Sequence, residues 1–258
     1  MGHLSSDPGG STMRLDRVLV ERGLARSRSH AQDLIKSGQV KVAGRLVERP
    51  ARIIDGAAPL QVNGDPWVSR GAHKLIGALD DSGLAVPPRV LDAGASTGGF
   101  TQVLLSRGAR CVYAVDVGHD QLATQLRADP RVRDIEGLNV RDLTLSVVDG
   151  VPVPLIVGDV SFISLRLLLA PLASVLDPHG RALLLVKPQF EVGPQGLDGR
   201  GVVRDGELRR AAVRRIVDAA RDLGLESQWQ GPSRLPGPAG NVEYFVCFRW
   251  STFPPSPG

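Results

Sequence analysis

The stretch that decides the fold is Val90-Leu91-Asp92-Ala93-Gly94-Ala95-Ser96-Thr97-Gly98-Gly99-Phe100. Its apolar start is typical of a buried strand, and its glycine-rich continuation is typical of a loop that leads into a helix. Glycines let backbone N–H groups approach a ligand closely, and the N-terminus of a helix follows directly. The stretch therefore predicts a strand, a loop and a helix that together hold a cofactor.

The glycine spacing narrows the kind of cofactor. It is G-x-x-x-G-G, with Asp92 ahead of it, which is neither the dinucleotide pattern nor a P-loop. The next apolar run ends at Asp116, 22 residues after Gly94, where a carboxylate can hold a ribose diol. The spacing resembles motif I of the class I S-adenosylmethionine-dependent methyltransferases. A structural turn, or a nucleotide site of another kind, is the alternative interpretation of this motif alone.

The chain beyond residue 68 predicts an α/β fold. Short, almost continuous apolar runs, typical of strands buried on both faces, alternate there with helical patterns. The expected strands are 89–91, 111–115, 132–136, 155–157, 182–186 and 243–249, and the expected helices include 98–106, 121–128, 165–176 and 207–223. These elements predict a doubly wound, Rossmann-like sheet, whose ligands bind at the carboxyl ends of the strands.

The basic charge of the chain is concentrated near its N-terminus. The formal net charge is +4. Ten basic and four acidic residues lie between Arg14 and Arg52, whereas residues 53–258 together carry a net charge of −1. Such concentration is typical of a module that binds a polyanion, and a well-solvated surface is the alternative.

The basic module predicts a small α+β domain. Apolar residues from Leu15 onward recur at helical spacing, Ser27 can cap a second helix, and residues 40–62 suggest short strands with Ala43-Gly44 as the tightest turn. The strings R-L-D-x-x-L-x-x-x-G-L-A-x-S-R and G-x-V-x-V-x-G-x-x-V resemble the S4-like RNA-binding domain of RNA-modifying enzymes. That resemblance implies RNA contacts by Arg14, Ser27, Arg28, Lys36 and Lys41.

Polar residues follow two further apolar strands. Asp159 comes after Leu155-Ile156-Val157-Gly158, and Lys187 comes after the run that ends at Val186. A lysine there is costly to desolvate unless it is paired, and a lysine that reaches the surface is the alternative. Together with Lys74 and Glu243, these residues form an ordered Lys, Asp, Lys, Glu set that resembles the catalytic residues of the FtsJ-like ribose 2′-O-methyltransferases.

Five ordered motifs extend the resemblance to nearly the whole chain. The strings S-R-G-A-H-K-L, D-A-G-A-S-T-G-G-F, D-V-S-F-I-S-L, V-K-P-Q-F-E-V-G and P-G-P-A-G-N-V-E-Y-F resemble the TlyA family, which joins an S4-like domain to an FtsJ-like methyltransferase. The resemblance implies S-adenosylmethionine as cofactor, ribosomal RNA or ribosomal subunits as partner, and 2′-O-methylation of cytidine in 16S rRNA, 23S rRNA or both. The cofactor contacts that it implies are Asp92, Gly94, Ala95, Ser96, Thr97, Gly98, Gly99, Phe100, Asp116, Asn139 and Asp159.

The chemistry of the four candidate catalytic residues is consistent with this activity. A ribose hydroxyl is a poor nucleophile at neutral pH, so methyl transfer needs removal of its proton and an in-line approach to the methyl carbon. Lys187 could accept the proton, or it could only steer the hydroxyl while its positive charge favours the developing alkoxide. Neither scheme requires a metal.

Two other classes of function stay open at this point: a non-catalytic RNA- or ribosome-binding protein, and a hemolysin that acts on membranes. No apolar run approaches the roughly 20 residues of a membrane helix, so we expect a cytoplasmic protein without stable membrane insertion. The expected domain limits are an extension or tag at 1–12, the S4-like domain at 13–62, a linker at 63–68, the methyltransferase domain at 69–250 and a tail at 251–258.

Overall fold

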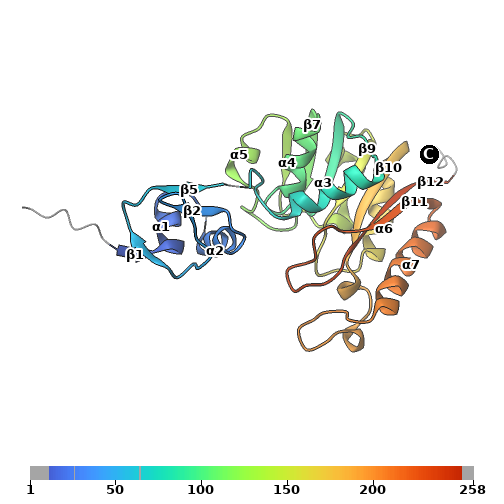
Figure 1. Cartoon of the computed structure of the whole chain (residues 1–258). Helices are drawn as coiled ribbons and strands as arrows, with labels where there is room; N and C mark the ends of the chain where they lie inside the picture. The colour runs from blue at the N-terminus through green and yellow to red at the C-terminus, as the bar shows by residue number, and fades with distance from the viewer. Residues whose placement is uncertain (1–11, 26, 64, 252–258) are drawn as a thin grey trace, which may run out of the picture. The chain divides into compact units, whose positions relative to one another are not determined.

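The computed structural model describes residues 12–25, 27–63 and 65–251 (Figure 1). The chain divides into two compact units between Pro66 and Trp67. The expected N-terminal extension and C-terminal tail lie outside the described residues, apart from Thr12 and Ser251. Thr12 already belongs to the first strand, so regular structure begins one residue earlier than expected.

The first unit is a small α+β domain, as expected. Its elements are β1 (Thr12–Arg14), α1 (Leu15–Glu21), α2 (Arg28–Lys36), β2 (Val40–Val42), β3 (Arg45–Leu46), β4 (Ile53–Asp55) and β5 (Leu60–Val62). Strand β1 pairs with β4, and β2 lies between β3 and β5. Ala43 and Gly44 both have positive φ, which gives the β2–β3 hairpin the turn geometry that matches strand twist. The core of this unit includes Leu15, Leu19 and Ile35.

The second unit is built on one sheet. Seven of its described strands form the sheet: β6 (Arg89–Ala93), β7 (Cys111–Val115), β8 (Val132–Ile135), β9 (Val153–Gly158), β10 (Leu176–Val186), β11 (Leu225–Pro232) and β12 (Tyr244–Trp250). Their order is β11-β12-β10-β9-β6-β7-β8. Strand β12 is antiparallel to both of its neighbours, whereas the pairs from β10 to β8 are parallel. The order reverses between β6 and β9, which makes the carboxyl ends of these two strands the topological switch point.

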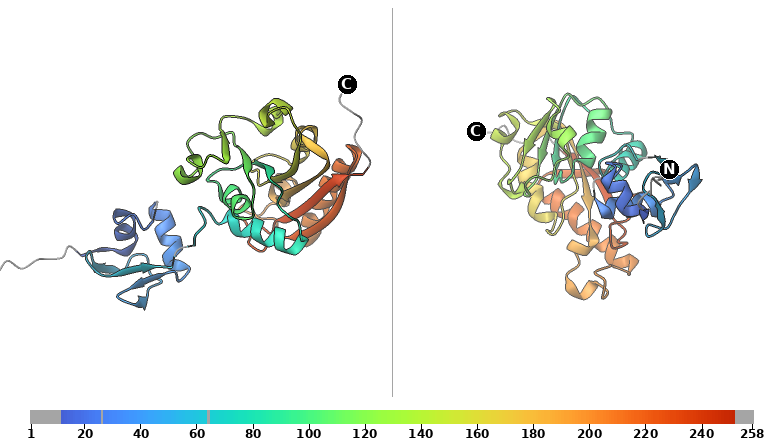
Figure 2. Two further views of the ribbon diagram at one scale, coloured as in Figure 1. Left: turned by 90° about the horizontal axis from the view of Figure 1, so that it is seen from above. Right: turned by 90° about the vertical axis from the view of Figure 1, so that its left-hand side faces the viewer.

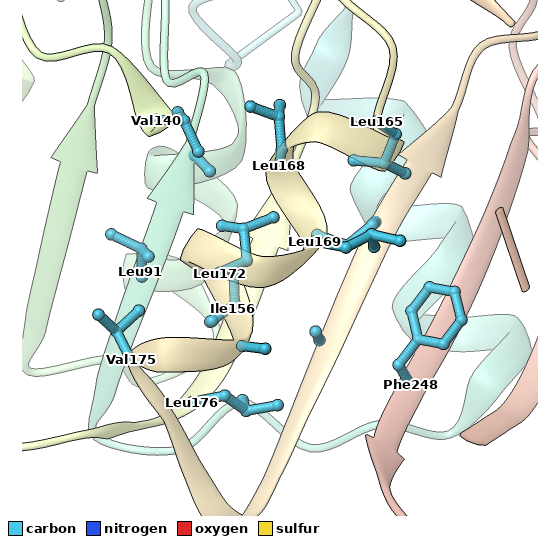
Figure 3. Close-up of a cluster of buried hydrophobic side chains, with 14 of the residues drawn as sticks. Leu91, Val140, Ile156, Leu165, Leu168, Leu169, Leu172, Val175, Leu176 and Phe248 are labelled. Carbon is cyan, nitrogen blue, oxygen red and sulfur yellow. The ribbon is translucent and has the colours of Figure 1, made fainter. Parts of the chain in front are cut away.

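Helices cover both faces of this sheet (Figures 1 and 2). They are α3 (Gly71–Ser82), α4 (Gly99–Ser106), α5 (Thr124–Arg127), α6 (Arg166–Ser174) and α7 (Gly206–Asp222), with short 3-10 turns at Val140–Asp142, Leu145–Val148, Pro188–Phe190 and Pro194–Gly196. Alternate residues of the strands contribute to two separate cores. In one core, side chains of α6 such as Leu168 and Leu172 pack on Leu91 and Ile156 (Figure 3).

The other core lies between the sheet and helices α3 and α4. It contains Leu75 and Leu104 from the helices, with Val90 and Leu155 from the strands. Because each central strand contributes to both cores, its sequence is apolar without clean alternation. The α/β fold with a doubly wound sheet and a small N-terminal domain is thus confirmed.

Three elements differ from the expectation. Helix α5 begins at Thr124 rather than at residue 121. The backbone N–H groups of Asp120 and Gln121 donate to the Glu136 carboxylate at 2.8 and 3.2 Å, which holds this segment outside the helix. Strand β10 begins at Leu176 rather than at residue 182, and its register against β9 is irregular before Arg181. Strand β11 was not expected, since it lies at the edge of the sheet and its sequence LESQWQGP is mostly polar.

Candidate active site

The glycine-rich loop lies at the switch point, between the ends of β6 and β9. Gly94 has a φ of +82°, and a Cβ added there would lie 3.1 Å from the backbone oxygen of Asp159. Gly98 has a φ of +92°, and its added Cβ would lie 2.8 Å from the Leu122 side chain. The packing of the protein itself therefore requires glycine at these two positions, whether or not the loop holds a ligand.

Asp92 is a completely buried carboxylate at the end of β6. Its Oδ2 accepts a hydrogen bond of 2.7 Å from the Thr101 hydroxyl, while its Oδ1 has no hydrogen-bond partner among the described residues. Burial raises the pKa of Asp92 to about 7, and the negative charges of Asp159 and Asp116 act in the same direction. An orphaned acceptor in this position fits a cationic donor.

Asp116 lies just beyond the end of β7, beside the glycine-rich loop. Its Oδ2 accepts from the backbone N–H of Ser96 and its Oδ1 from that of Gly118, both at 2.8 Å. These bonds fix the carboxylate, yet each oxygen keeps a second acceptor site for a ligand hydroxyl. Asn139 caps the short turn after β8, where its Oδ1 accepts from the Arg141 N–H at 3.0 Å.

Not every residue of the loop exposes its side chain. Phe100 is 3 % exposed, and its ring stacks on that of Phe245 with centroids 6.1 Å apart. The structure thus gives the Phe100 side chain a place in the core and leaves only its backbone for a cofactor contact. Ala95 is likewise buried, and a Cβ on Gly99 would collide with Ser69. Thr97 accepts from the Ala123 N–H through its backbone oxygen.

Lys187 and Asp159 form the first of two ion pairs at this edge of the sheet. They follow β10 and β9, which are adjacent parallel strands, and Lys187 Nζ lies 2.5 Å from Asp159 Oδ1. The same Nζ donates to the Ser161 hydroxyl at 2.5 Å. Lys187 is 7 % exposed, so its ammonium does not reach the surface as a snorkelling lysine would.

Lys74 and Glu243 form the second pair, although 169 positions separate them in the chain. Lys74 projects from α3, and Glu243 immediately precedes β12, opposite the end of β10. Lys74 Nζ lies 2.6 Å from Glu243 Oε2, and Gln189 Nε2 donates to Glu243 Oε1 at 3.0 Å. A Cβ on Gly237 would lie 2.6 Å from Glu243 Oε1, so a glycine there makes room for the carboxylate.

The two pairs are close to each other in the fold. A Cβ added to Gly71, one turn before Lys74 on α3, would lie 3.9 Å from Asp159 Oδ2. Gln189, which bonds Glu243, lies two residues after Lys187. The structure therefore brings all four candidate catalytic residues to one edge of the sheet, beside the glycine-rich loop.

Sequence reasoning missed two aromatic residues at this edge. Phe162 is 91 % exposed, and its φ of +65° is unusual for a bulky residue. Its ring contacts that of Phe190 at 5.4 Å between centroids. Both residues belong to motifs already quoted, D-V-S-F-I-S-L and V-K-P-Q-F-E-V-G, where each follows a candidate catalytic residue by three positions. A strained, exposed ring at a site is a signal of function that only the structure provides.

The candidate RNA contacts belong to the first unit. The Arg14 guanidinium donates to the Asp16 carboxylate at 3.1 and 2.9 Å, and Arg28 donates to the same carboxylate at 3.2 Å. Ser27 caps α2 by accepting from the His30 N–H at 3.2 Å. Lys36 lies exposed in the last turn of α2, and Lys41 lies on β2. Across residues 12–25, 27–63 and 65–251, no helix is both long and apolar enough to cross a membrane.

Comparison with known families identifies both units. Residues 67–250 match the model of the FtsJ-like methyltransferases, and residues 13–58 match that of the S4 domain.

Similar chains are known from several bacteria. The chain is 49 % identical to the 16S/23S rRNA (cytidine-2′-O)-methyltransferase TlyA of Mycobacterium tuberculosis, over 93 % of this chain and 90 % of that protein. It is 37 % identical to Hemolysin A of Brachyspira hyodysenteriae, over 92 % of this chain and 99 % of that protein. Among solved structures, a protein of Streptococcus thermophilus that carries a hemolysin name is 35 % identical, with a TM-score of 0.74 over 95 % of this chain and 91 % of that one.

Proposed function

The chain belongs to the TlyA family of FtsJ-like methyltransferases, and from this premise we propose that it transfers a methyl group from S-adenosylmethionine to the 2′-hydroxyl of a cytidine in ribosomal RNA. The observation that carries the proposal is the pair of lysine–carboxylate contacts at the carboxyl edge of the sheet, in which both lysines are buried. Burial of a charged group costs desolvation free energy even when the group is paired. General acid–base chemistry at a hydroxyl is a function that accounts for such charges at this site.

The contacts of Lys187 favour a role at the target oxygen. An ammonium has three N–H donors, and Lys187 directs one of them at the Ser161 hydroxyl while its charge is paired with Asp159. A further N–H can hold the 2′-oxygen and stabilise the negative charge that develops on it. The alternative, in which Lys187 accepts the proton itself, uses the same position of the nitrogen. Lys74 and Glu243, with Gln189, lie at the same edge of the sheet.

The residues around the glycine-rich loop fit S-adenosylmethionine. The unpartnered Oδ1 of Asp92 would be satisfied by the cationic amino group of the methionine moiety, and Asp116 has acceptor sites left for the ribose hydroxyls. Bound S-adenosylmethionine supplies a methyl carbon that is activated by a sulfonium sulfur. The other expected contacts, from Gly94 to Gly99 and at Asn139, complete the proposed cofactor site.

The aromatic pair supports an RNA nucleotide as the substrate. An exposed ring offers a face on which an unstacked base can lie, and such stacking is worth about 1–3 kcal/mol per base. Phe162 directly follows Ser161, whose hydroxyl accepts from Lys187, so a base stacked on Phe162 would bring its own ribose toward Lys187. We assign Phe162 to the positioning of the target base.

The S4 unit supports ribosomal RNA as the partner. We propose that Arg14, Arg28, Lys36 and Lys41 contact the phosphate backbone, and that Ser27 acts mainly by capping α2. We further propose residues 13–62 as the RNA-binding domain, 69–250 as the methyltransferase domain and a cytoplasmic location, where ribosomes are found.

The test is transfer of labelled methyl from S-adenosylmethionine to purified small and large ribosomal subunits. Label should enter RNA with the wild-type chain and with the control Arg221→Ala, which removes an exposed cation of α7. It should be lost with Lys187→Ala. Absence of label on either subunit and on free ribosomal RNA, with a folded chain that still binds RNA, would favour the non-catalytic alternative. Leakage of lipid vesicles without methyl transfer would favour the hemolysin alternative.

A further inference from the structure

A single buried carboxylate organises the arginines of the first unit. Asp16, in the first turn of α1, has no exposed surface. Arg14 binds it in bidentate fashion, with Nε 3.1 Å from Oδ1 and Nη2 2.9 Å from Oδ2. Arg28 Nε and Gln32 Nε2, both from α2, donate to Oδ2 at 3.2 and 3.1 Å. One carboxylate thus links the start of α1 to two positions of α2.

The two arginines are held at one end and open to solvent at the other. Their side chains are 41 % and 60 % exposed, whereas that of Asp16 is 0 % exposed. A guanidinium carries five N–H donors. Arg14 directs two of them at Asp16 and Arg28 directs one, so most of their donors are left for a ligand. The bond from Arg14 holds the pKa of Asp16 well below its usual range, so the carboxylate stays charged at neutral pH.

We propose that Asp16 is a positioning residue of the RNA-binding surface, which sets the guanidinium groups of Arg14 and Arg28 in place before RNA arrives. This inference rests on the proposed RNA-binding role of the first unit. A free arginine side chain loses rotamer freedom when it binds a phosphate, and an arginine already fixed by Asp16 avoids most of that loss. The carboxylate therefore strengthens the binding of a polyanion although it carries the same sign of charge.

This inference and simple electrostatics predict opposite results for one substitution. Asp16→Asn raises the net charge of the unit by one, which by itself tightens binding to RNA. If Asp16 positions two arginines, the substitution weakens binding, by about tenfold for the two side chains together. The matched control is Asp33→Asn on α2, which makes the same change of charge at an exposed position of the same unit.

The experiment measures binding of the full chain to 16S rRNA transcribed in vitro, by filter binding at several salt concentrations. We expect Asp16→Asn to bind about tenfold more weakly and Asp33→Asn to bind as tightly as the wild type or more tightly. The slope of the logarithm of the binding constant against the logarithm of the salt concentration should be shallower for Asp16→Asn, by an amount that corresponds to about one to two phosphate contacts. In a chain that already carries Arg14→Ala and Arg28→Ala, Asp16→Asn should weaken binding no further, because the groups through which it acts are gone.

A second measurement covers the case in which Asp16→Asn does not fold. In NMR spectra of the wild-type chain without RNA, the Nε–H groups of both arginines should exchange slowly with solvent and show restricted motion, since both donate to Asp16. Averaged, rapidly exchanging Nε–H signals would overturn the inference, as would tighter RNA binding by a folded Asp16→Asn chain. A wild-type chain that binds no RNA would overturn the proposed role of the unit together with this inference.

Discussion

The buried carboxylate of Asp92 predicts an unusual dependence of stability on pH. Its pKa is raised from 3.8 to about 7 in the folded chain. Between these two values the folded state binds more protons than the unfolded state, so the free energy of unfolding falls as pH rises. Above pH 7 Asp92 is ionised in both states, and its contribution becomes constant. The second unit is therefore less stable at pH 8 than at pH 4 as far as Asp92 is concerned.

The size of this effect follows from the pKa difference. At about 1.36 kcal/mol for each pH unit of that difference, ionisation of Asp92 costs about 4 kcal/mol. Asp92→Asn removes this titration but keeps an oxygen that can accept from Thr101. The difference in unfolding free energy between variant and wild type should change by about 4 kcal/mol from pH 4 to pH 8, in favour of the variant.

Urea unfolding followed by tryptophan fluorescence measures this difference. All three tryptophans, at positions 67, 229 and 250, belong to the second unit, so the signal reports on that unit. The exposed Asp222→Asn serves as the control, and its difference from wild type should not follow this trend. A difference for Asp92→Asn that stays constant with pH would refute the reasoning.

Three further predictions concern the site and its loop. Lys187→Ala should lower the rate of methyl transfer by about 10²–10⁴-fold through loss of the group at the target oxygen, and single-turnover kinetics with ribosomal subunits would check it; an unchanged rate would exclude Lys187 from the chemistry. Phe162→Gly should lower the rate of methyl transfer without lowering the free energy of unfolding, because the Phe162 ring is 91 % exposed and the backbone φ of +65° suits glycine. Parallel urea titrations and kinetic assays separate the two effects, and a loss of stability would contradict the assignment. Gly98→Ala should destabilise the second unit by about 2–4 kcal/mol, since a Cβ at φ +92° meets Leu122 and Leu126; urea unfolding at one pH measures this, and a neutral result would show that the loop can rearrange.

Much of the second unit could be predicted from local sequence. The glycine-rich loop and the acid at the end of the next strand depend on residues that are close together in the chain, and so do the apolar runs of the central strands. Parallel strands bring their carboxyl ends to one edge, so Asp159 and Lys187 could be expected to meet. Their 2.5 Å contact agrees with that expectation.

Other features depend on contacts that sequence spacing does not encode. Lys74 and Glu243 were linked to the site only by resemblance, and their pairing across 169 positions depends on how α3 and β12 pack. Strand β11 escaped prediction because an edge strand needs few apolar residues. The first turn of α4 points the Phe100 ring at Phe245 in the core, so the expected cofactor contact of Phe100 stays a prediction for its backbone only.

The central claim is that this chain methylates the 2′-hydroxyl of cytidine in ribosomal RNA with Lys187 at the target oxygen. The most direct measurement is mass spectrometry of nucleosides from ribosomal subunits incubated with S-adenosylmethionine and either the wild-type chain or Lys187→Ala. The account predicts 2′-O-methylcytidine with the wild type and none above background with the variant. Methyl groups on a base instead of the ribose, or equal amounts of 2′-O-methylcytidine with both chains, would contradict it.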